Sequence, residues 1–123
     1  MANTRLFKTY DVDGPLAPYR IVAHSSTAGN VRQAAAPTDA LMGAADELGK
    51  QPNGRTDIAL SDLPEVETGA AIAAGQALTS DAEGRAVPAT ATGQRIIGFA
   101  LEGASAAGTI ITYVFAPGFY TTA

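Results

Sequence analysis

Three short apolar runs dominate the C-terminal half of this 123-residue chain. They lie between Gly69 and Phe115, and Gly-rich turns separate them. Their length and their β-branched and aromatic content predict strands rather than helices. In the most apolar run, residues 109–115, apolar side chains occupy both faces. A strand of a single small sheet should turn one polar face to water, so we expect a second layer or a neighbouring subunit to cover this strand.

Shorter runs predict further strands at residues 20–24, 31–34, 41–45, 56–60 and 65–67. Residues 77–88 predict a hairpin around Asp81–Gly84, because Asp first and Gly fourth are typical of a type I turn followed by a left-handed residue. Gly43 indicates a close approach of another backbone. The pattern therefore predicts an all-β chain of short antiparallel strands.

A weak internal repeat emerges when the chain is shifted by 55 residues against itself. Gly29 then falls on Gly84, and residues 41–45 fall on residues 96–100. The order of strand, glycine turn, strand, loop and alternating strand matches better than the residue identities do. The repeat suggests two similar β-units that together close a small barrel or sandwich, although compositional accident is an equal alternative in a chain so rich in Ala and Gly.

The two ends of the chain predict extended arms around a β domain at residues 19–116. Residues 1–18 contain Gly14, Pro15 and Pro18, which disfavour regular structure, yet they are too apolar for a solvated tail. The N-terminal arm lies either on its own domain or over a neighbouring subunit; residues 117–123 form a second arm. The candidate residues for contact with a partner protein or with another subunit are Leu6, Phe7, Tyr10, Val12, Tyr113, Phe115, Phe119 and Tyr120.

Composition narrows the choice of partners. The formal net charge is −4, and the 8 Lys and Arg residues are scattered, so nucleic acid is not an expected partner. No apolar stretch approaches the ~20 residues of a membrane span, and a signal-peptide block is lacking, so synthesis in the cytoplasm is expected. The aromatic content is 7% and Cys is absent, so the thin core favours stabilisation by a partner or by oligomerisation.

Candidate catalytic residues are few, and none has a supporting motif. His24 is the single histidine and lacks a second His or Cys with which to share a metal. Carboxylates two residues apart, such as Glu65 and Glu67, share a strand face and can bind Ca²⁺ or act as acid and base. A solvated strand face explains them more simply. We expect no enzyme activity and no cofactor.

Residues 18–116 resemble the capsid decoration, or cement, proteins of tailed bacteriophages. The resemblance rests on the run Ala74–Ala89, on Ile96–Leu101, and on Gly108 before a terminal apolar strand, with Arg20–His24 fitting in the first half. It implies a small β-barrel of tulip-like form or a jelly-roll-like sandwich. It also implies a virion protein on the outer capsid surface, binding the major capsid protein and itself as a homodimer or homotrimer.

Such a protein would bridge major capsid protein subunits and so stabilise the shell without touching the packaged DNA. Many copies on one lattice make weak single contacts sufficient. One alternative is a small β-barrel accessory domain that binds a carbohydrate or a carboxylate ligand. A weaker one is a β-barrel enzyme that uses paired carboxylates.

Overall fold

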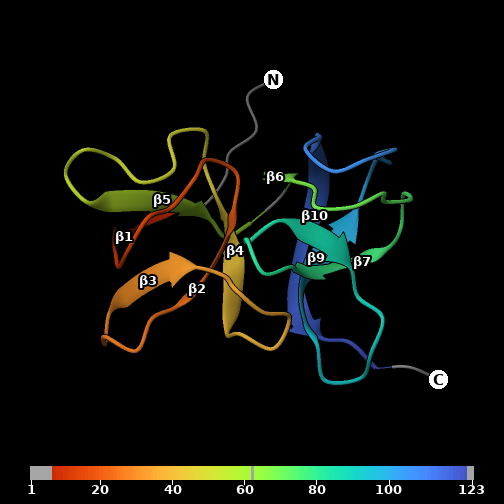
Figure 1. Cartoon of the computed structure of the whole chain (residues 1–123), viewed down its shortest axis with the longest axis horizontal. Helices are drawn as coiled ribbons and strands as arrows, with labels where there is room; N and C mark the ends of the chain where they lie inside the picture. Colours follow the sequence, from red (N-terminus) through yellow and green to blue (C-terminus); the bar gives the residue numbers. More distant parts are fainter. Residues whose placement is uncertain (1–6, 62, 122–123) are drawn as a thin grey trace.

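The computed structural model describes residues 7–61 and 63–121, and regular structure within them consists of strands alone (Figure 1). This confirms the all-β prediction. The strands are β1 (Phe7–Val12), β2 (Ile21–His24), β3 (Asn30–Gln33), β4 (Leu41–Ala45), β5 (Arg55–Ala59), β6 (Glu65–Glu67), β7 (Ala77–Ser80), β8 (Ala86–Pro88), β9 (Arg95–Ala100) and β10 (Ile110–Phe119).

The first five strands form a unit of their own, which we call unit 1 (residues 7–60). They close into a barrel in the order β1-β3-β2-β4-β5, with β1 returning to pair with β5. Alternate side chains of the strands turn inward. The inward residues pack as one buried cluster, which contains Val12, Leu16, Val22, Val31, Met42, Ala45 and Ile58.

The last five strands form unit 2 (residues 64–120), a sheet in the order β6-β10-β9-β7-β8. Its edge strands β6 and β8 approach each other through a single parallel bridge between Thr68 and Ala86. Pro88 lies in the edge strand β8, as expected for a residue that cannot donate to a sheet ladder. Unit 2 is therefore a five-stranded sheet whose two edges meet at a single bridge.

The two units share their strand pairing residue by residue. Ala44 pairs with Ala59 in unit 1, and the residues 55 positions later, Phe99 and Val114, pair in unit 2. The pair Val22–Gln33 corresponds to Leu78–Pro88, with shifts of 56 and 55 residues. The extra residue falls within the β2–β3 hairpin. Matching registers support the predicted repeat, but each unit folds on its own strands rather than the two closing one barrel together.

A glycine at the same place in each unit explains why this stretch repeats. A Cβ on Gly43 would lie 2.7 Å from the carbonyl oxygen of Ala59, and a Cβ on Gly98 would overlap the carbonyl oxygen of Val114. Ala59 and Val114 are themselves equivalent in the two units. The close backbone approach predicted at Gly43 is thus confirmed, and it recurs at Gly98.

The units pack through the outer face of unit 1. Ile21 and Leu41 point away from the barrel interior and join the core of unit 2, where Leu78, Ile97 and Tyr113 are buried. Strand β4 lies at the seam between the two units (Figure 1). The largest core of the molecule is therefore shared by both units, and the inner face of unit 2 is completed by unit 1.

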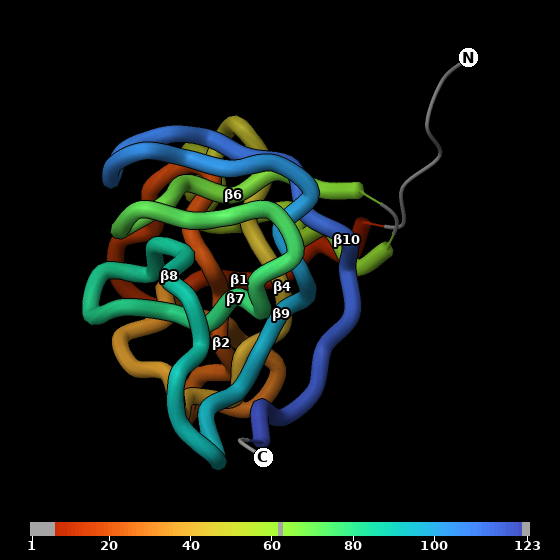
Figure 2. The backbone as a smooth tube through the Cα atoms, turned by 90° about the vertical axis from the view of Figure 1, so that its right-hand side faces the viewer, coloured from red at the N-terminus to blue at the C-terminus, as the bar shows by residue number. Residues whose placement is uncertain are grey.

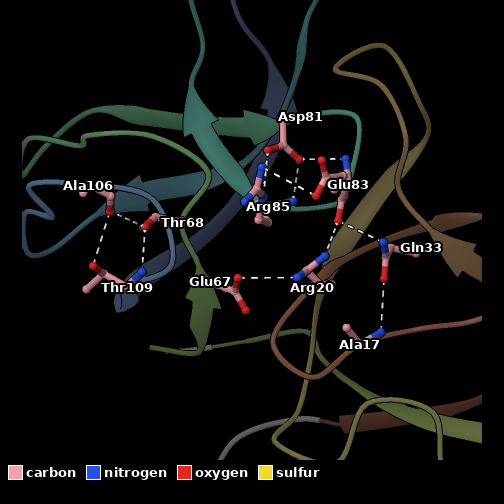
Figure 3. A network of polar contacts seen from close by, with 10 residues as sticks. All are labelled: Ala17, Arg20, Gln33, Glu67, Thr68, Asp81, Glu83, Arg85, Ala106 and Thr109. Carbon is pink, nitrogen blue, oxygen red and sulfur yellow. Dashed lines mark hydrogen bonds and ion pairs between the residues drawn. The ribbon is translucent and has the colours of Figure 1, made fainter.

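A polar network ties the Asp81–Gly84 turn of unit 2 to unit 1 (Figure 3). The Glu83 carbonyl accepts hydrogen bonds from Arg20 Nη1 at 2.8 Å and from Gln33 Nε2 at 2.9 Å, and Ile21 N donates to the Gly84 carbonyl at 2.6 Å. Asp81 Oδ1 accepts from the backbone N–H groups of Glu83 and Arg85. The predicted turn is confirmed, and its tip is a docking element.

The chain ends differ from the expected arms. Residues 7–12 are a barrel strand that pairs with β5 along Phe7–Asp11, because Tyr10 and Val12 alternate toward the core. Strand β10 continues to Phe119, which pairs with Arg95, and Figure 2 shows it running down one side of the molecule. The expected N-terminal boundary at residue 18 falls in the loop between β1 and β2. The expected C-terminal boundary at residue 117 falls within β10.

Candidate docking surfaces

An apolar strip lies exposed on the outer face of unit 2. Phe99 of β9 is 40% exposed, Leu101 just after β9 is 49% exposed, and Ile110 of β10 is 40% exposed. Phe99 pairs with Val114, and the backbone of Leu101 bonds to Thr112, so these side chains share one face of the β9–β10 ladder. We call Phe99, Leu101, Ile110 and Val114 the outer strip.

The outer strip corresponds in part to covered positions of unit 1, because the counterparts of Phe99 and Val114 are buried, whereas Ile110 corresponds to the exposed Arg55. Phe99 corresponds to Ala44, which is completely buried against unit 2. On unit 2 a different element covers part of the equivalent face, because Tyr120 packs on Ala77 and Ile96. The outer strip begins where that cover ends. The duplication thus leaves one apolar sheet face without an intramolecular partner among the described residues.

The predicted contact residues separate into buried and exposed groups. Val12 and Tyr113 lie in the two cores, at 8% and 0% exposure, so neither offers a contact surface. Phe115 packs against the shared core, and Tyr10 packs against the unit 1 core. Tyr120 lies on its own sheet. Phe7 and Phe119 remain exposed, at 44% and 64%, while Leu6 lies outside the described residues.

Alternation along β10 explains the misplacement of Tyr113. Ile111, Tyr113 and Phe115 point inward, whereas Ile110, Thr112 and Val114 point outward. Both faces are apolar, as the sequence shows, but the strand turns its odd-numbered residues to unit 1. The exposed contact candidates on this strand are therefore the even-numbered ones.

A surface pocket of about 260 Å³ lies beside the seam. Phe7 and Tyr19 line it together with the acidic residues Asp46, Glu47 and Glu65. Pro64, at the start of unit 2, forms part of its wall. The pocket therefore combines aromatic surface with negative charge and draws residues from both units.

Tyr19 holds this region together through its backbone. Its N–H donates to the Asp46 carbonyl at 3.2 Å, and its carbonyl accepts from Glu67 N at 2.9 Å. Its φ of 59° places it in the left-handed region, which is costly for a residue with a Cβ. Burial raises the pKa of Asp46, with further raising contributions from Asp57 and Glu47, against hydrogen bonds from backbone N–H groups.

No group of three or more His, Cys, Asp or Glu residues within 7–61 and 63–121 could hold a metal ion. In the same residues, no helix is long and apolar enough to cross a membrane. His24 ends β2 with an exposed side chain.

A comparison with known proteins identifies the family of the chain. A family model described as phage cement protein matches residues 20–115, which is most of the chain. The chain belongs to the phage cement protein family. This cement protein is accordingly a structural component of a phage, which confirms the resemblance seen in the sequence.

A solved structure shares the fold of this cement protein. The head fiber gp8.5 N base of bacteriophage phi29 superposes with a TM-score of 0.60 at 22% sequence identity. The match covers 92% of this chain and 95% of that chain. At this identity the likeness establishes the fold. No curated protein matches the sequence at a significant level.

Sequence reasoning named none of the outer strip residues as a contact candidate, and it also missed the pocket and the docking role of Gly84. Phe99 and Ile110 lay within predicted strands. Assigning each residue of these strands to one of the two sheet faces would have placed both side chains on the same face. The pocket had no sequence signal, because Phe7, Tyr19, Asp46 and Glu65 come from four separate segments.

Proposed function

We propose that this chain binds the outer surface of a phage head and bridges neighbouring major capsid protein subunits, thereby stabilising the shell. The observation that carries the proposal is the exposed outer strip of unit 2. Its residue Phe99 corresponds to Ala44 of unit 1, which is buried in the core shared by the two units. An apolar sheet face of this kind, left open in a soluble chain, is typical of a docking surface.

The proposed capsid contact consists of the outer strip, with Phe7 and Phe119 as exposed aromatic anchors. Aromatic side chains often dominate the binding energy of an interface. Phe119 is held in place by Arg95, whose guanidinium carbon lies 4.6 Å from the ring centroid. Many copies on one lattice make a modest affinity per copy sufficient. We further propose that the protein assembles as a homodimer or homotrimer.

Binding to purified, DNA-free phage heads tests the proposal. Phe99→Asp and Leu101→Asp place charges on exposed positions and should leave the fold intact, as checked by circular dichroism. We expect capsid binding in a co-sedimentation assay to fall by about tenfold or more. Ala28→Asp adds the same charge at the exposed tip of the unit 1 hairpin and should bind like the wild type.

Equal binding of all three variants would reject the outer strip as the capsid contact. Failure of the wild type to bind or stabilise any shell would reject the cement role. Light scattering after size-exclusion chromatography tests the oligomeric state. The alternative of a carboxylate-binding module is disfavoured by the pocket, whose three carboxylates repel an anion.

A further inference from the structure

The pocket beside the seam is built to hold a positively charged group. Three of its lining residues are Asp46, Glu47 and Glu65. Within residues 7–61 and 63–121, the ion pairs engage other carboxylates, namely Glu67, Asp39, Asp11, Asp81 and Glu83. The pocket carboxylates thus lack a described cationic partner. Asp46 is partly buried. A partly desolvated carboxylate gains more from a nearby cation than a fully solvated one does.

The shape and spacing of the pocket decide which cation fits. The described carboxylates do not come together as a metal-binding group. Two aromatic residues, Phe7 and Tyr19, line the same space, and aromatic surface favours a flat, weakly hydrated cation over a compact one. A volume of about 260 Å³ is small for a drug-sized ligand but sufficient for one long side chain. These features together favour an arginine guanidinium.

We propose that this pocket receives an arginine side chain presented by the capsid surface on which the protein sits. The proposal rests on the cement role proposed above and adds the chemistry of one contact. Pro64 and Glu65 come from unit 2, whereas Phe7, Tyr19 and Asp46 come from unit 1. An arginine bound there contacts both units at the seam, so binding and the packing of the units support each other.

Titration with N-acetyl-arginine amide tests the pocket without any capsid. In ¹H–¹⁵N NMR spectra we expect saturable shifts at Phe7, Tyr19 and Glu47, and none with the neutral N-acetyl-glutamine amide. The double variant E47Q/E65Q should weaken binding by about five- to tenfold. The control D11N/E83Q removes the same charge from exposed carboxylates outside the pocket and should titrate like the wild type. Equal weakening in both variants, or shifts spread over all acidic residues, would overturn the site.

The same variants on phage heads separate this proposal from the general cement role. We expect E47Q/E65Q to bind heads about fivefold more weakly than D11N/E83Q. If the pocket binds the probe but both variants bind heads equally, the capsid assignment of the arginine is overturned while the cement role stands. If removal of residues 1–6 tightens probe binding, Arg5 of the chain itself competes for the pocket, which also overturns the assignment to the capsid. If the wild type binds no heads, the cement role fails.

Discussion

Equivalent strands pair in the same register in unit 1 and unit 2. The two units nevertheless bury their small cores in different ways. Unit 1 closes with a strand pair between β1 and β3 and fills its own interior. Unit 2 closes through one bridge and places its interior against the outer face of unit 1. The two units therefore share a backbone arrangement, but unit 2 relies on unit 1 to cover its interior.

The difference also separates stability from recognition. The outer face of unit 1 is used up in holding unit 2, where Ala44 is buried completely. The equivalent face of unit 2 carries Phe99 and remains open in part. The hairpin tips differ in the same way. Gly84 is pressed against Gln33 and Ile21, while a Cβ on Gly29 would meet nothing within 4 Å. Recognition is thus expected where unit 2 departs from unit 1.

The largest effect is expected at the shared glycine position. Gly98→Ala forces a Cβ into the Val114 carbonyl and should lower the free energy of unfolding by about 4 kcal/mol or more. Gly43→Ala meets the Ala59 carbonyl less severely and should cost about 2 kcal/mol. Urea denaturation measures both. Gly118→Ala, which meets no neighbour within 4 Å, is the control; a Gly98→Ala variant as stable as the control would refute the close approach.

Adjacent residues of β2 distinguish the two cores. Ile21 points into the shared core and Val22 into the unit 1 core, and both are completely buried. Ile21→Ala should cost about 3 kcal/mol and Val22→Ala about 2 kcal/mol. Native-state hydrogen exchange should show faster exchange in β7 and β9 for Ile21→Ala, and in β3 and β4 for Val22→Ala. Identical exchange patterns would contradict the division into two cores.

The polar seam should contribute less than the shared core. Arg20→Ala removes the exposed hydrogen bond to the Glu83 carbonyl and the 3.4 Å ion pair with Glu67, which is partly shielded from water. We expect a loss of about 1–2 kcal/mol by urea denaturation. Arg55→Ala breaks an exposed ion pair with Asp11 inside unit 1 and should cost about 0.5 kcal/mol or less. Equal losses would mean that the seam network adds nothing to the junction.

The smallest effect is a pH-dependent one at Asp46. Burial raises the pKa of Asp46 above its usual value of 3.8, so the native state binds this proton more tightly than the unfolded state and loses stability as the pH rises through the folded pKa. Asp46→Asn keeps an acceptor for Leu48 N and removes the charge. We expect a slightly higher melting temperature than wild type at pH 7, and no difference well below pH 3.8.

Asp39 provides the opposite sign. The hydrogen bond from Arg32 lowers the pKa of Asp39, so its contribution is present above the unfolded value of 3.8 and is lost as the pH falls through the folded pKa. Asp39→Asn should therefore be less stable than wild type at pH 7 and should converge with it in acid. A melting-temperature series from pH 7 to acid distinguishes the two variants, and matching pH profiles would contradict both assignments.

Much of the fold was readable from the sequence because the repeat is backed by backbone sterics. The apolar-apolar-Gly pattern at residues 41–45 and 96–100 marks the place where two strands nearly touch, and the Asp81–Gly84 turn carries its own hydrogen-bond chemistry. Strand β1 escaped prediction because Gly14 and Pro15 follow it closely and only Tyr10 and Val12 turn inward. The Gly and Pro residues next to β1 hid the short alternation of inward and outward side chains in this strand.

The candidate surfaces were less predictable for a physical reason. When both faces of β10 are apolar, only the packing of the units decides that Tyr113 is buried and Ile110 is open. Likewise, the pocket needs Phe7, Tyr19 and Glu65 to be brought together by the barrel and by the entry into unit 2. Neither choice is encoded within one local window of sequence.

The free hairpin of unit 1 has a practical consequence for peptide display. Residues Ser26–Gly29 are exposed, and a Cβ on Gly29 would meet nothing within 4 Å. A foreign peptide inserted between Ala28 and Gly29 extends into solvent without entering the seam or the outer strip, because exposed loop tips tolerate insertion best. One hairpin per copy would then present the insert as a regular array on any lattice that the protein coats.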